Sequence, residues 1–190
     1  MKSIRAVGLS AFLAFSLAPA LADDITDAIE QARKAYQGGD LANAKQSLDL
    51  ASQLIGQRNA ESFATLLPNP LPGWKAEKAQ AQAQAMGAVV FGASVASRTY
   101  SNGQGDNVEV QITGDSALVM QFAPLLANPQ FAGAMGKIIK VGNQRAIQTS
   151  DGDVNMVVNN KFLVTVNGSA PAAAKLAYAQ AVDVTRLAKM

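Results

Sequence analysis

The boundary that organises this chain lies at residues 66–74, which read LLPNPLPGW. Pro68, Pro70 and Pro72 lack the backbone N–H that helices and central strands require, so this stretch is expected to be extended. Trp74, the single tryptophan of the 190-residue chain, directly follows a Pro-Gly turn and is expected to close the edge of a core. We therefore predict a Pro-rich connector over residues 66–73, which separates a helical hairpin at 23–65 from a sheet domain at 74–190.

Apolar residues recur at helical spacing on the N-terminal side of this connector. The expected helices have one apolar face each, made of Ile25, Ala28, Ile29, Ala32 and Tyr36 in the first and of Leu41, Ala44, Leu48, Ala51 and Ile55 in the second. Between them, Gly38-Gly39 suits the exit from a helix, and Asp40 can cap the next one. So tight a turn predicts that the two helices pack antiparallel.

Seven positions of the expected hairpin have the residue types of a known repeat motif. In order, the motif has a small residue, an aromatic residue, a Gly-Asp turn, and then a small, a large and a small residue. These positions are occupied here by Ala32, Tyr36, Gly39, Asp40, Ala44, Leu48 and Ala51. Residues 24–58 therefore resemble a single tetratricopeptide repeat. No second copy of the pattern follows downstream, so the resemblance does not imply the stacked groove of a repeat array. A generic helical hairpin that packs on the following domain is the alternative.

Strand patterns dominate the C-terminal side of the connector. Residues 75–85 alternate alanine with polar residues, which favours a strand that begins at Trp74, followed by a loop through residues 87–92. Their Ala, Gln, Lys and Glu content favours a helix instead, so both interpretations stay open. Further strands are expected at 95–100, 108–113, 137–141, 145–149, 154–158 and 162–166, with a helix at 117–126 and a final helix at 172–188.

This order of elements predicts an α+β fold. Its parts are an N-terminal helical hairpin, an antiparallel sheet of about six to seven strands with an inserted helix, and a C-terminal helix packed on the sheet. The Leu-Pro-Gly-Trp sequence at 71–74 and the element order over 67–190 are similar to the PsbP-type α/β sandwich family. That resemblance implies an exported or lumenal accessory protein. It includes no ligand motif, and the leading hairpin departs from the simplest members.

The first 22 residues have the pattern of a secretory signal peptide. Lys2 and Arg5 precede an apolar run over residues 6–17, and Ala20-Leu21-Ala22 forms the small-x-small cleavage pattern. The run of about 12 residues is shorter than the roughly 20 of a membrane-spanning helix, so no membrane span is expected. We expect cleavage after Ala22 and a periplasmic or secreted product. Because both basic residues leave with the leader, residues 23–190 have 14 basic and 14 acidic residues.

Composition excludes several kinds of chemistry. The chain has no cysteine and no histidine, which removes disulfides, thiolate or imidazole metal sites and Ser-His-Asp triads within the chain. A neutral product has no long-range field that would steer nucleic acid. Asp151-Gly152-Asp153 has the acidic alternation of a calcium loop, but position 12 is Phe162 instead of glutamate, so a solvated hairpin turn is expected. We therefore assign no catalytic, cofactor-binding or metal-ligating residue.

The remaining binding candidates are aromatic and basic residues. Trp74, Arg98, Tyr100 and Arg145 form a candidate protein-docking patch, because tryptophan, tyrosine and arginine are enriched at interface hot spots. The alternative is plain cross-strand stacking on an exposed sheet face. Our leading hypothesis is an exported, non-enzymatic accessory protein that contacts another envelope protein. The alternative is a periplasmic carrier of an apolar small molecule or lipid, and a carboxylate-based hydrolase ranks below both.

Overall fold

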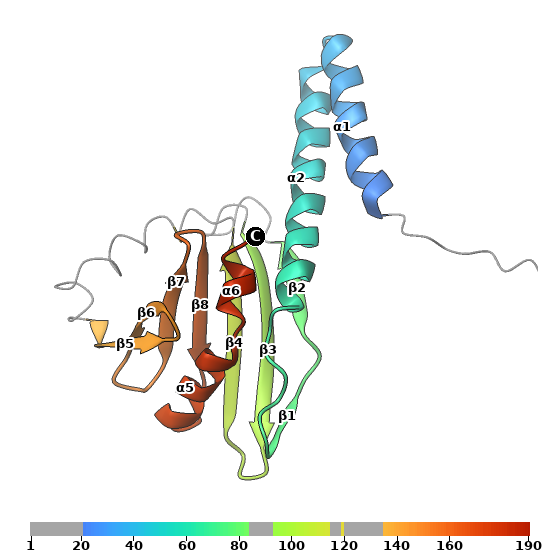
Figure 1. Cartoon of the computed structure of the whole chain (residues 1–190). Helices are drawn as coiled ribbons and strands as arrows, with labels where there is room; N and C mark the ends of the chain where they lie inside the picture. The colour runs from blue at the N-terminus through green and yellow to red at the C-terminus, as the bar shows by residue number, and fades with distance from the viewer. Residues whose placement is uncertain (1–20, 84–92, 115–118, 120–134) are drawn as a thin grey trace, which may run out of the picture.

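The structure is a computed structural model, and it describes residues 21–83, 93–114, 119 and 135–190. A helical hairpin lies at its N-terminal end (Figure 1). Helix α1 (Leu21–Gln37) and helix α2 (Leu41–Ala64) pack antiparallel. Gly39 makes the turn at φ +77°, a conformation that costs glycine little. The Asp40 side chain accepts a hydrogen bond from the backbone N–H of Asn43 at 3.0 Å and so caps α2, as the sequence predicts.

The described strands form one antiparallel sheet of eight strands. They are β1 (Trp74–Ala76), β2 (Gln80–Ala83), β3 (Ser94–Asn102), β4 (Asn107–Gly114), β5 (Lys137–Val141), β6 (Gln144–Gln148), β7 (Val154–Val158) and β8 (Phe162–Asn167). Their order is β1-β3-β4-β8-β7-β6-β5, and β2 also pairs with β3. This confirms the predicted α+β class. The expected helix at 117–126 lies outside the described residues apart from Val119, and so does the expected loop at 87–92.

The edge next to the connector differs from the single strand expected from Trp74 onward. Two short strands share this edge: β1 pairs with residues 100–102 of β3, and β2 pairs with residues 94–97. Between them, the backbone N–H of Glu77 donates to the carbonyl of Thr99 at 2.9 Å. The alternating pattern predicted the extended backbone but not the interruption between β1 and β2. Because of this interruption, the sheet has one strand more than the upper limit of the six to seven expected.

The helices that touch the sheet pack on one of its faces (Figure 1). Helix α5 (Ala172–Ala181) and helix α6 (Val184–Leu187) cover the centre, and α2 covers the part near β2 and β3. The single final helix expected over 172–188 is wrong, because Val182 is extended and the Asp183 side chain caps a new helix at Arg186 N. The core beneath them includes Tyr100, Met156, Phe162, Tyr178 and Leu187.

The lower third of α2 attaches the hairpin to the sheet. The ring of Phe63 meets that of Phe162 edge-on at 5.5 Å, above Gly114, where a Cβ atom would lie 2.7 Å from the Phe63 ring. The Gln57 side chain bonds the carbonyl of Ala81 and the N–H of Ala83. The N-terminal part of α2 projects away from the sheet together with α1 (Figure 1).

Candidate functional site

The residues of the predicted docking patch lie in two separate places. Trp74, Arg98 and Tyr100 lie beside the connector, whereas Arg145 lies on β6 near the opposite edge of the sheet. Tyr100 is fully buried, so its expected position on an exposed face is wrong. Trp74 is half-buried and packs edge-on against Tyr178 with ring centroids 5.4 Å apart.

Tyr100, Arg98 and Tyr178 fix the connector to the sheet. The Tyr100 hydroxyl donates to the carbonyl of Pro68 at 2.6 Å, and the Arg98 guanidinium donates to the same oxygen at 3.2 Å. The Tyr178 hydroxyl accepts a hydrogen bond from the backbone N–H of Leu71 at 3.2 Å. The tilted rings of Tyr100 and Tyr178 lie 4.3 Å apart. The connector is thus irregular, as expected, but its residues Leu66 and Leu67 are part of the core, and it attaches the hairpin to the sheet.

Burial of Tyr100 makes the attachment sensitive to alkaline pH. Burial raises the pKa of Tyr100 to about 12, and the Arg98 guanidinium opposes part of that rise. In the unfolded chain the tyrosine pKa is about 10. The native state therefore holds this proton more tightly, and its stabilising effect is complete below about pH 10 and is lost as the pH rises toward 12.

We expect the free energy of unfolding to fall between about pH 10 and pH 12, with a shallower fall in Tyr100→Phe. Urea titrations at fixed pH values measure both slopes. Tyr178, whose pKa burial also raises, is present in both proteins and contributes a fall of its own to each slope. Equal slopes would contradict the assignment. The variant also loses the bond to Pro68, which lowers its overall stability without altering this comparison.

Arg145 belongs to a different surface feature. It is exposed on β6 directly opposite Lys140 on β5, and both line an open depression of about 530 Å³ with Ile138, Ile139, Asn143 and Gln144. Neither cation has an ion-pair partner among the described residues. Lysine on an edge strand such as β5 also discourages edge-to-edge pairing of sheets. The depression is open to solvent, so water can solvate both cations and no bound ligand is needed to explain them.

The projecting hairpin has an exposed apolar surface, whose residues were predicted to belong to the same helix faces as the buried alanines. The two helices meet along a seam of small side chains, in which Ala28, Ala32, Ala44 and Ala51 are buried. Five of the six larger members of the same predicted faces lie outside the seam and are 44–69% exposed, namely Ile29, Tyr36, Leu41, Leu48 and Ile55, whereas Ile25 is partly buried. We call these five residues the apolar face of the hairpin.

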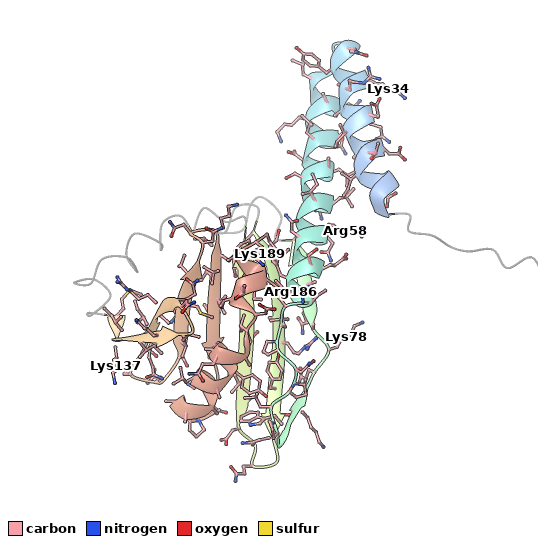
Figure 2. All side chains as sticks on the ribbon, viewed as in Figure 1. Lys34, Arg58, Lys78, Lys137, Arg186 and Lys189 are labelled. Atoms are coloured by element: carbon pink, nitrogen blue, oxygen red, sulfur yellow. The ribbon has the colours of Figure 1, made fainter. Side chains whose placement is uncertain are left out.

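All five residues lie on one side of the hairpin. Helical periodicity turns Ile29 and Tyr36 of α1, and the three residues of α2, about 30° to 80° away from the seam in the same rotational sense. Because the helices run antiparallel, these turns bring both sets to the same side. The opposite side is polar, with Lys34 and Asn43, except for Leu50. Figure 2 shows Lys34 near the free end of the hairpin and Arg58 lower on α2.

Ion pairs border the apolar face on both helices. Arg33 pairs with Glu30 at 2.8 Å on α1, and Lys45 pairs with Asp49 on α2. The Arg33 guanidinium lowers the pKa of Glu30, which keeps that carboxylate charged. An apolar centre with a polar border is the usual layout of a protein-binding surface. The seven-residue spacings within the two predicted faces were the signal that could have located it.

Other kinds of site have little support in the described part of the chain. No group of three or more acidic side chains there could hold a metal ion. None of the helices in those ranges has the length and hydropathy needed to cross a bilayer.

Comparison with known proteins gave no match. Neither a family model, nor a curated protein, nor a solved structure matches this chain significantly. The tetratricopeptide and PsbP-type resemblances therefore stay predictions.

Proposed function

We propose that this protein is an exported, non-enzymatic accessory protein that acts through protein contacts made by the apolar face of the hairpin. One observation carries the proposal: five large apolar side chains share one side of a projecting helical hairpin and are about half exposed. Contiguous apolar surface with a polar border is typical of interaction sites. The pattern of a secretory leader at 1–22 supports export.

The energetics favour a covered face. Full burial of a large aliphatic or aromatic side chain contributes about 1.5–3 kcal/mol, so covering the exposed half of five would contribute on the order of 5 kcal/mol before the cost of association. The alanine seam buries little apolar area in comparison, because an alanine side chain is one methyl group. A partner on the apolar face would therefore stabilise the projecting half of the hairpin.

The other two hypotheses have less support. A carrier needs space between the sheet and α5, and that layer is filled by Tyr100, Met156 and Tyr178. A carboxylate hydrolase needs two acids that converge on one site, and two of the acids in the strands and loops already have other partners: Asp153 pairs with Lys175, and Asp106 bonds the Asn102 side chain. Neither hypothesis has an observation comparable to the apolar face.

Site-specific photo-crosslinking in intact cells tests the proposal. A photoreactive residue at position 48 reports on the apolar face, and one at position 50 is the matched control, since Leu50 is exposed to a similar degree on the opposite side of the same helix. We expect a protein adduct from position 48 and at least ten-fold less from position 50. No adduct from position 48, or equal adducts from both positions, would contradict the proposal.

A further inference from the structure

We propose that the apolar face is covered by a second copy of this chain, so that two hairpins form an antiparallel four-helix bundle. This inference rests on the proposed function, because it names the partner of the same face. Three features of the hairpin support it: the spacing of the apolar residues, the distribution of charge around them, and the free length of the helices.

The spacing fits a helical bundle. Leu41, Leu48 and Ile55 recur every seven residues on α2, and Ile29 and Tyr36 do so on α1. Side chains at this spacing stay on one side of helices that pack at a shallow angle, as in coiled coils and four-helix bundles. The face is two helices wide, so its complement is a surface that is also two helices wide. A second hairpin of this chain has that shape.

The charges fit a like partner. The border charges, Arg33 with Glu30 and Lys45 with Asp49, are neutralised within each copy, and the apolar face itself contains no charged residue. Pairing two copies therefore brings no unpaired charge into the contact. Residues 23–190 have equal numbers of acidic and basic residues, so two copies do not repel each other at long range.

The free length of the hairpin leaves room for pairing. Residues 41–55 of α2 precede Gln57, which bonds strand β2, and they span about 22 Å at the rise of an α-helix. In an antiparallel pair the two sheets lie at opposite ends of the bundle, because each hairpin projects from its own sheet (Figure 1). A closed two-fold pair in which α2 packs on α2 of the second copy brings the same patch of both copies together, and Leu48, the middle residue of its row, then lies near the axis.

Light scattering of the protein purified after export, coupled to size-exclusion chromatography, tests the pairing. We expect twice the mass of one chain at micromolar concentration. Leu48→Glu should raise the dissociation constant at least ten-fold and give a monomer, while Leu50→Glu should remain a dimer. Far-ultraviolet circular dichroism shows whether each variant retains its helices. A wild-type monomer, a Leu48→Glu dimer, or equal disruption by both variants would overturn the inference.

A thiol experiment gives an independent measurement. The chain has no cysteine, so Leu48→Cys introduces its single thiol. Under copper-phenanthroline oxidation we expect a disulfide-linked dimer from Leu48→Cys and little from the matched Leu50→Cys. Equal crosslinking of both variants, or none from Leu48→Cys, would overturn the pairing. If the purified protein is monomeric while photo-crosslinking at position 48 captures a different protein, the inference fails and the proposed function stands. If position 48 captures nothing in cells, the proposed function itself fails.

Discussion

Replacing Tyr178 with alanine is expected to lower the free energy of unfolding by about 3–5 kcal/mol, the usual cost of removing a buried aromatic side chain. Tyr178 is fully buried in α5, and its ring contacts both Trp74 and Tyr100. The variant also leaves the N–H of Leu71 without its acceptor. Urea unfolding followed by tryptophan fluorescence measures the loss directly, because Trp74 is the single tryptophan.

Tyr178→Phe separates the hydrogen bond from the packing. It keeps both ring contacts and removes the acceptor of Leu71, so a loss of about 1 kcal/mol is expected. If Tyr178→Ala cost no more than Tyr178→Phe, the ring contacts would contribute little and the connector would have to be held in another way.

The second large effect concerns a buried lysine. The Lys175 side chain on α5 is 3% exposed, and its amine donates to Asp153 Oδ1 at 2.6 Å and to the carbonyl of Asp151 at 2.7 Å. Asp153→Ala leaves this amine buried with a single acceptor, and we expect a loss of about 3 kcal/mol. Lys175→Met should cost less, about 1–2 kcal/mol, because the remaining Asp153 carboxylate is 33% exposed and water can solvate it.

The order of these two losses is the decisive result. Thermal and urea unfolding of both variants at neutral pH measure it. A larger loss for Lys175→Met than for Asp153→Ala would show that the lysine stem, and not the buried charge, dominates the contact.

This part of the loop between β6 and β7 was expected to be a solvated turn. Asp153 instead fastens it to α5, while Gly152, at φ +81°, lies where a Cβ atom would meet Ala172 at 2.5 Å.

The elements with local signals could be predicted from the sequence. The strands from 137 to 166 appear within one residue of their expected limits, because Gly142-Asn143 and Asn159-Asn160 mark the turns. Asn159 and Asn160 both have positive φ, as the central residues of a type I′ turn require, and the N–H of Lys161 closes this turn on the carbonyl of Val158 at 3.1 Å. Asp40 likewise marked the start of α2. In each case, a few neighbouring residues determine the conformation.

The features that depend on distant contacts could not be predicted. Leu71 and Tyr178 are 107 positions apart, and nothing near either residue signals their hydrogen bond. Arg98 and Tyr100 do share a strand face, but only the tertiary packing shows that this is the covered face. On the hairpin, periodicity placed alanines and larger residues on one face. The choice of the alanines for the seam depends on how closely the two helices approach each other.

The order of the sheet also affects how the chain folds during synthesis. The central strand β4 pairs with β8, so Gly114 meets Phe162 only after the 47 residues between them have emerged. Until then, one edge of β4 has no neighbouring strand. Closing so large a loop costs conformational entropy before the hydrogen bonds between β4 and β8 can form. The fold therefore completes late. That delay lengthens the period in which an unpaired strand edge can aggregate, and under the export proposed above it would also keep the chain unfolded for longer before translocation.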